Sequence, residues 1–189
     1  YGGSPAAVTA TIDYVTIAST GNAADFGDLT AVRTGNSGGT SPTRGVSLGG
    51  YTPGLVNIID YVEMSTTGDA IDFGDLAAAI RTGDAVDSST RAIRGGGAVS
   101  PESPGFSNTM EYVTIASKAN SVNFGDLTAA LTGTQLAGTS NSLRGIFGGA
   151  NIGSDSNAIE YVTISSAGDA TDFGDLVSGF GGYAAAVSD

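Results

Sequence analysis

The chain repeats one segment four times, and this repetition constrains its fold more than any other feature. A hydrophobic residue, an acid, tyrosine and valine recur, and successive tyrosines lie 47, 51 and 49 residues apart. Each copy is followed by the sequence Phe-Gly-Asp-Leu. The paired segments are 12–15 with 26–29, 59–62 with 73–76, 110–113 with 124–127, and 159–162 with 173–176. Such a period indicates a supersecondary unit that buries its apolar face only against its neighbours. We therefore expect residues 1–189 to form a single repeat domain.

Within one repeat, the pattern predicts four short strands. The turn signal Ser41-Pro42-Thr43 separates the first two, a loop at 51–57 precedes the third, and Thr67-Gly68-Asp69 precedes the fourth. The expected strands are 34–41, 44–48, 58–64 and 70–76. A helix from Leu76 to Arg81 is the competing interpretation, because alanine favours helices. The equivalent stretches contain threonine, valine or glycine without a sustained helical period, so we expect no regular helix.

The repeat boundaries suggest how the ends of the chain relate to each other. The repeats run approximately over 1–32, 33–80, 81–130 and 131–179. Residues 180–189 match the start of a repeat, and Tyr1-Gly2-Gly3 matches the end of its second strand. We therefore expect 180–189 to close onto the N-terminus and complete one more unit. We also expect this chain to be part of a longer polypeptide.

Composition excludes several classes of function. The formal net charge of -12 disfavours binding to nucleic acid and to anionic lipid surfaces. The chain contains neither cysteine nor histidine, which excludes disulfides, zinc sites built from those residues, and Ser/His or Cys/His catalytic pairs. No apolar run approaches the length of about 18 residues that a membrane-spanning helix needs. We predict no cofactor, no metal and no catalytic residue.

The acidic residues near each Phe-Gly-Asp-Leu segment are the strongest candidates for a ligand site. Asp69, Asp72 and Asp75 are spaced three residues apart, and so are Asp169, Asp172 and Asp175. Oxygen ligands in turns suit calcium, which takes six to eight of them. The spacing differs from that of known calcium loops, and the acids recur between repeats. We therefore favour a structural role, in which these side chains bind backbone groups in turns. A catalytic pair of carboxylates is disfavoured, because such a pair need occur only once.

Arginines recur at the start of the second strand of each repeat. Since an unpaired buried charge is costly, we expect Arg44 and its equivalents, Arg91 and Arg144, to pair with Asp28, Asp75 or their equivalents. An anion site is the alternative. Lys118 and Arg94 occur in one copy only, and we expect both in solvent.

The copies differ mainly in the loop after the glycine pair, at 4–10, 51–57, 98–108 and 150–157. Variable loops of repeat proteins often lie on one face and form the binding surface. Exposed aromatic and proline residues on such a rim suit a sugar ring or a protein partner. The candidate binding residues are Tyr51, Pro53, Pro101 and Phe106.

The order of features in each copy resembles the kelch repeat of β-propellers. These features are Gly49-Gly50, Tyr61, Phe73 with Leu76, and Arg81, and they return as Gly96-Gly97, Tyr112, Phe124 and Leu127. The resemblance implies an all-β, kelch-like β-propeller with four blades of about four short antiparallel strands, the last blade closed by both termini. In such a ring, one phenylalanine and one leucine of each copy are available to pack between blades. These structural anchors are Phe26, Leu29, Phe73, Leu76, Phe124, Leu127, Phe173 and Leu176.

The amino-acid sequence of the repeats also resembles repeats in structural and fibre proteins of marine tailed phages. The similar stretches are Tyr-Val-Thr-Ile-Ala-Ser, Asp-Phe-Gly-Asp-Leu and Thr-Arg-Gly-Val. This resemblance implies a non-enzymatic adhesion module of a virion appendage, such as a tail fibre, located on the particle surface. Its partners would be other virion proteins or a host glycan or protein, and the fibre would allow a homo-oligomer. The alternatives are a cellular or secreted interaction propeller and a carbohydrate-active enzyme on the same scaffold.

Overall fold

The chain folds entirely into β-structure over the residues described. The computed structural model describes residues 8–99, 105–128, 136–151 and 155–180. These residues form 14 strands in four antiparallel sheets and contain no helix. The all-β prediction is confirmed, as is the absence of a helix after Leu76. Accordingly, the described residues offer no helical segment that could cross a membrane.

The sheets follow the order of the repeats. The first is a hairpin of two strands, and each of the others is a meander of four strands that are neighbours in sequence. The hairpin consists of β1 (Thr11–Tyr14) and β2 (Ala24–Asp28). The second sheet comprises β3 (Ser37–Thr40), β4 (Arg44–Thr52), β5 (Gly54–Glu63) and β6 (Ile71–Asp75). The third comprises β7 (Asp84–Asp87), β8 (Arg91–Gly95), β9 (Thr109–Thr114) and β10 (Val122–Asp126). The fourth comprises β11 (Ala137–Ser140), β12 (Arg144–Asn151), β13 (Asp155–Thr163) and β14 (Thr171–Phe180).

The expected loop at 51–57 is instead the tip of a long hairpin. Tyr51 pairs with Leu55 and Thr52 with Gly54, so that within 51–57 only Pro53 at the tip and Asn57 at a bulge have no partner in the ladder between β4 and β5. Proline lacks an N–H donor and is tolerated at such a turn. The prediction of a loop was therefore wrong for most of this segment.

A glycine bulge near the end of the last strand of each sheet brings the next sheet close. Gly27, Gly74 and Gly125 have φ of 149°, 150° and 149°, a conformation that side chains disfavour. A Cβ atom at these positions would lie 2.3–2.5 Å from a backbone oxygen of the following sheet. The glycines are thus required by close approach as well as by backbone conformation.

Two hydrophobic clusters lie between consecutive four-stranded sheets. One joins the second and third sheets and the other joins the third and fourth. Phe73 and Leu76 belong to the former, and Phe124 and Leu127 belong to the latter. Each sheet therefore completes its core against its neighbour, as expected for a repeat protein.

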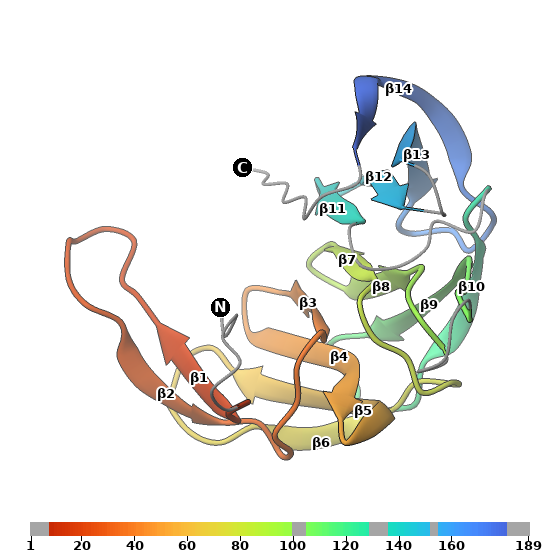
Figure 1. Cartoon of the computed structure of the whole chain (residues 1–189). Helices are drawn as coiled ribbons and strands as arrows, with labels where there is room; N and C mark the ends of the chain where they lie inside the picture. The colour runs from red at the N-terminus through yellow and green to blue at the C-terminus, as the bar shows by residue number, and fades with distance from the viewer. Residues whose placement is uncertain (1–7, 100–104, 129–135, 152–154, 181–189) are drawn as a thin grey trace.

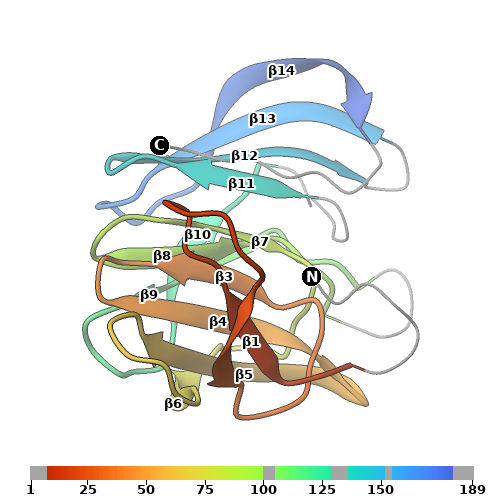
Figure 2. The same ribbon diagram turned by 90° about the vertical axis from the view of Figure 1, so that its left-hand side faces the viewer.

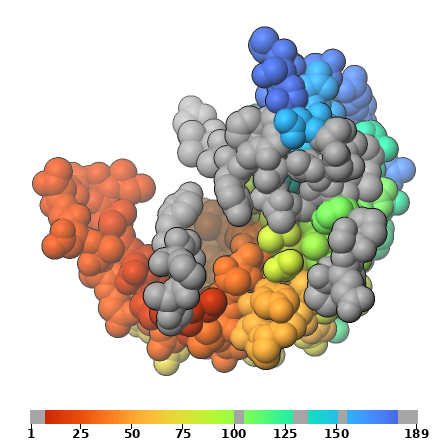
Figure 3. Space-filling view, viewed as in Figure 1, coloured from red at the N-terminus to blue at the C-terminus, as the bar shows by residue number. Residues whose placement is uncertain are grey.

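The sheets follow one another around an open arc (Figure 1). The short strands β3, β7 and β11 contact one another on the inside of the arc, and β6, β10 and β14 lie at the outer edges of their sheets. Viewed from the side, the fourth sheet lies above the third (Figure 2). The hairpin β1–β2 and strand β14 form opposite ends, and the hairpin projects from the remainder (Figures 1 and 3). Of the segments expected to close a ring, 1–3 and 180–189, only Phe180 is among the described residues, and it is the last residue of β14.

Candidate functional site

Consecutive sheets are joined by a repeated set of hydrogen bonds, and we call each such contact a junction. At the first junction, the N–H groups of Gly68 and Ala70 donate to the carbonyls of Phe26 and Asp28, at 2.7 and 2.8 Å. The loop before the last strand of one sheet thus docks on the last strand of the preceding sheet. The corresponding bonds at the other junctions run from Ser121 to Asp75, from Gly168 to Phe124 and from Ala170 to Asp126.

The acidic cluster predicted from the sequence takes part in these junctions. Asp69 Oδ1 accepts the N–H of Asp28 at 3.1 Å. Asn120 and Asp169 do the same for Asp75 and Asp126, both at 3.0 Å. The first residue of each acidic triplet therefore binds backbone of the preceding repeat, rather than of its own turn. Among the described residues, no group of three or more acidic side chains is arranged to hold a metal ion.

A second acid also crosses each junction. Asp60 Oδ2 accepts the N–H of Thr30 at 3.2 Å, and Asp60 Oδ1 accepts its hydroxyl at 2.6 Å. Glu160 receives the same two donors from Thr128. At the second junction, Glu111 Oε1 accepts the N–H of Ala77 at 3.2 Å. These acids belong to the Ile-Asp-Tyr-Val segment and its equivalents, so that both repeated motifs have a role at the junction.

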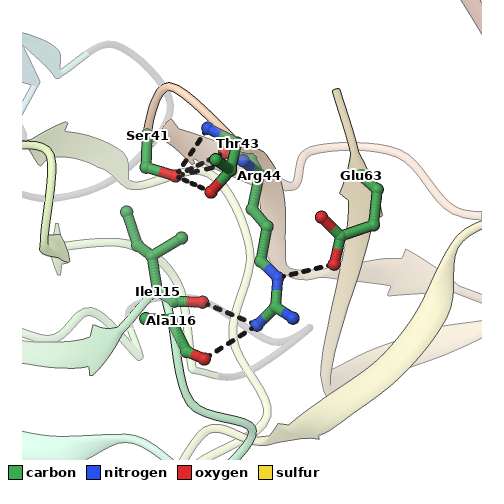
Figure 4. Close-up of polar contacts among 6 residues, drawn as sticks. All are labelled: Ser41, Thr43, Arg44, Glu63, Ile115 and Ala116. Atoms are coloured by element: carbon green, nitrogen blue, oxygen red, sulfur yellow. Dashed lines mark hydrogen bonds and ion pairs between the residues drawn. The ribbon is translucent and has the colours of Figure 1, made fainter. Parts of the chain in front are cut away.

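The recurring arginines also bind across the junctions, but not to the acids we expected. Arg44 Nη1 donates to the carbonyls of Ile115 and Ala116 in the next sheet, at 3.1 and 3.0 Å (Figure 4). Its Nε donates to Glu63 at 2.8 Å, and its guanidinium lies over the ring of Tyr61. Arg91 and Arg144 stack on Tyr112 and Tyr161 in the same way, and Arg91 Nη1 donates to the carbonyl of Ile164.

The predicted pairing with Asp28 and Asp75 is therefore wrong. The Arg44 side chain extends toward the turn that follows β9 in the next sheet. There its guanidinium meets backbone carbonyl groups rather than carboxylates. Stacking on tyrosine fixes the direction of the guanidinium.

A fully buried ion pair lies beside the first junction. Arg33 Nη1 is 2.8 Å from Asp60 Oδ2, and both side chains are inaccessible to solvent. Arg33 Nη2 also donates to Ser47 Oγ at 3.1 Å. Because the carboxylate also serves Thr30, this pair couples the hairpin β1–β2 to the second sheet.

A cavity of about 650 Å³ adjoins this ion pair, between the hairpin and the second sheet. Its volume lies within the range of about 300–1,000 Å³ typical of ligand sites. Its lining is rich in hydroxyl, amide and glycine backbone groups, and includes Thr11, Asp13, Arg33, Asn36, Gly39 and Thr40. The sequence did not predict this cavity, because the cavity forms only where the hairpin β1–β2 lies beside the complete sheet of the next repeat.

The third sheet carries a charge cluster in the equivalent place, with a buried arginine and two partly buried acids. Arg94 is buried, contrary to the expectation that it lies in solvent, whereas Lys118 is exposed as expected. Arg94 Nη1 donates to the carbonyl of Gly96 at 2.7 Å, and burial lowers the pKa of Arg94 to about 10. Burial likewise raises the pKa of Glu111 and of Asp84, although the charge of Arg94 partly opposes both shifts.

The predicted rim residues do not form one exposed patch. Tyr51 is half-buried, with the guanidinium of Arg81 4.9 Å from the centre of its ring. Pro53 is exposed at the tip between β4 and β5, and Phe106 is 38% exposed beside the bridge to Ala98. Pro101 lies outside the described residues.

The predicted anchors differ in burial according to their place in the arc. Phe73 and Phe124 are each 2% exposed, and Leu76 and Leu127 are also buried. Phe26, Leu29 and Leu176 are partly buried, whereas Phe173 is 52% exposed. Every anchor phenylalanine packs edge-to-face on the tyrosine of its own sheet, with ring centres 5.8–6.1 Å apart.

Comparison with models of protein families found no match, and a search of curated proteins found none either.

Proposed function

We propose that this chain is a structural and adhesion module of a phage virion appendage, built as a kelch-like β-propeller. In this proposal the three meanders are complete blades, and the hairpin β1–β2 supplies the outer strands of a fourth. The module binds a host surface glycan or protein, or another virion protein, without catalysing a reaction. The sequence resemblance and the radial order of the sheets support it (Figure 1).

The observation that carries the binding role is the cavity of about 650 Å³ beside the first junction. Its side chains offer hydrogen-bond donors and acceptors together, in Asn36, Thr40 and Thr11. Such groups match the hydroxyl groups of a sugar, which also donate and accept. A glycan is therefore the receptor class that this site fits best.

Binding by many copies on one particle would compensate for a weak single site. Linked weak sites gain avidity through high effective concentration. A cavity lined by both polar and apolar groups suits this mode of attachment.

Asn36→Ala tests the proposal on a glycan array. Asn36 lines the cavity and its Nδ2 donates to Ser47 Oγ at 2.7 Å, but the residue is exposed, so the fold should persist. We expect the unmodified chain to bind certain glycans on the array and the variant to lose binding to those same glycans. Asn157→Ala, an exposed asparagine of β13 outside this lining, is the matched control.

Two other results would contradict the proposal. Absence of binding to every glycan and to host surface extracts would remove the adhesion role. Release of reducing sugar from a panel of glycosides would favour a carbohydrate-active enzyme. Phe106→Ala on the same array tests whether the rim contributes.

A further inference from the structure

The outer end of the fourth sheet is a junction surface without a neighbour among the described residues. Phe173 is 52% exposed, whereas its equivalents Phe73 and Phe124 are 2% exposed. Gly174 keeps the bulge conformation, with φ of 141°, yet no atom of another described residue is seen within 4 Å of the place where its Cβ would be. Val177 is fully exposed. Together with Arg144 and Asp175, these three residues define the tail surface.

The opposite end of the arc exposes the complementary half of a junction. Ile17 is 98% exposed, but its equivalents Ile115 and Ile164 are buried against the preceding sheet. Val15 is likewise 58% exposed, although the corresponding valines of the third and fourth sheets are buried. We call Asp13, Val15, Ile17, Asn22 and Ala23 the head surface.

Polar groups of the two surfaces also match. Asn22 occupies the position of Asp69, Asn120 and Asp169, which accept the N–H of the aspartate in the preceding sheet. The N–H of Asp175 is the equivalent donor on the tail surface. Arg144 stacks on Tyr161 as Arg44 stacks on Tyr61, and the carbonyl of Ile17 is the equivalent of its cross-sheet acceptor.

We propose that the head surface of one copy of this chain binds the tail surface of a second copy, repeating the internal junction. The two surfaces lie at opposite ends of the arc (Figure 1). Backbone contacts at Gly27, Gly74 and Gly125 fix how each sheet lies on the next, so closing the gap within one chain requires a change at one or more of these junctions. Association between copies requires none of them to change. This inference depends on the junctions and not on the proposed adhesion function, and it places the closure of the propeller between copies rather than within one chain.

Such an interface is heterologous, because different surfaces of the two copies meet. Head-to-tail contacts produce closed rings when the rotation between copies closes, and open filaments when it does not. The chain should therefore associate as its concentration rises, into a closed ring of two or more copies or into an open filament.

One variant at each end tests this arrangement. Ile17→Asp blocks the head surface and Val177→Asp blocks the tail surface, and both side chains are exposed, so neither change disturbs the fold of one copy. We expect each variant alone to weaken association at least about tenfold in sedimentation velocity. Mixed in equal amounts, the two variants should form a dimer, because one intact head and one intact tail remain. Val122→Asp, at an exposed valine of β10 away from both ends, should associate like the unmodified chain.

Val177→Thr tests the register of the interface. Thr30 and Thr128 at the equivalent position donate their hydroxyls to Asp60 and Glu160. A threonine at 177 should donate to Asp13 of the second copy and tighten association by roughly two- to tenfold.

Three results would overturn the proposal. The first is a monomer at all concentrations, which would leave closure within one chain as the explanation. The second is association that neither aspartate variant weakens, and the third is a mixture that stays monomeric. Absence of glycan binding by the unmodified chain, with association intact, would contradict the adhesion function alone.

Discussion

Asp169 Oδ1 accepts a hydrogen bond from the backbone N–H of Asp126 at 3.0 Å, so that an acid of the fourth sheet holds the edge of the third. The same relationship joins Asp69 to Asp28, across 41 residues of sequence. The first acid of each of these two triplets thus binds backbone rather than a metal ion. Their repetition follows from the need to join every sheet to the next.

Asp169→Ala should destabilise the protein by about 0.5–1.5 kcal/mol, because the N–H of Asp126 loses its acceptor. Asp172→Ala changes an exposed acid of the same triplet for which no hydrogen bond to another described residue is seen, and should have little effect. Urea denaturation of both variants measures the difference. Equal losses of stability would contradict a specific role for Asp169.

Phe124→Ala should cost about 3–5 kcal/mol, because it opens a cavity in the cluster between the third and fourth sheets. Phe173→Ala should cost clearly less, since that ring is 52% exposed. Thermal unfolding at a concentration low enough to prevent association compares the two. A similar cost for both would show that burial between sheets is not what stabilises the anchors.

Asp60→Ala should cost about 3–5 kcal/mol, because it leaves the charge of Arg33 buried without its partner. The double variant Arg33→Met, Asp60→Leu should be less destabilised than Asp60→Ala, since no buried charge remains. A double-mutant cycle by chemical denaturation, completed with the single variants Arg33→Met and Asp60→Leu, measures the coupling. If the double variant loses as much free energy of unfolding as these two single variants together, the ion pair is not coupled.

Glu111→Gln should change how stability depends on pH. Burial raises the pKa of Glu111 in the folded protein, so the folded state binds its proton more tightly than the unfolded state does. The contribution of this group is therefore greatest below the ordinary pKa of glutamate, about 4.3, and is lost as pH rises through the folded value. Glutamine keeps an acceptor for the N–H of Ala77 but does not titrate.

The free energy of unfolding of the native chain, minus that of the Glu111→Gln variant, should fall as pH rises from about 4. Denaturation at a series of pH values measures it. A difference that rises with pH would mean that Arg94, rather than burial, determines the pKa of Glu111.

Repetition made the strands predictable from sequence. The turn at Ser41-Pro42-Thr43 and the strands on either side recur in each four-stranded sheet, so comparison of copies reveals them. The segment 51–57 varies between copies, and its strand character was missed although Tyr51, Leu55 and Val56 suit a ladder. The sequence variation at 51–57 between copies therefore reflects tolerance of substitution rather than an absence of secondary structure.

The junction contacts could not be predicted, because they join different repeats. Sequence indicated that Asp69 binds backbone, but not that this backbone belongs to Asp28. Arg94 was expected in solvent because it occurs once. Its equivalents are Ser47 and the buried Phe147, and this mixture of types at one position obscured its burial.

Each four-stranded sheet is one uninterrupted stretch of chain, with its strands in sequential order. Tandem duplication of one repeat in the gene would therefore add a whole sheet without changing the strand order of the others. Deletion of one repeat would likewise remove one whole sheet. A duplicated repeat would contain its own bulge glycine and its own acid that binds the backbone of the preceding sheet. The length of the arc is thus a property that recombination can change in single steps.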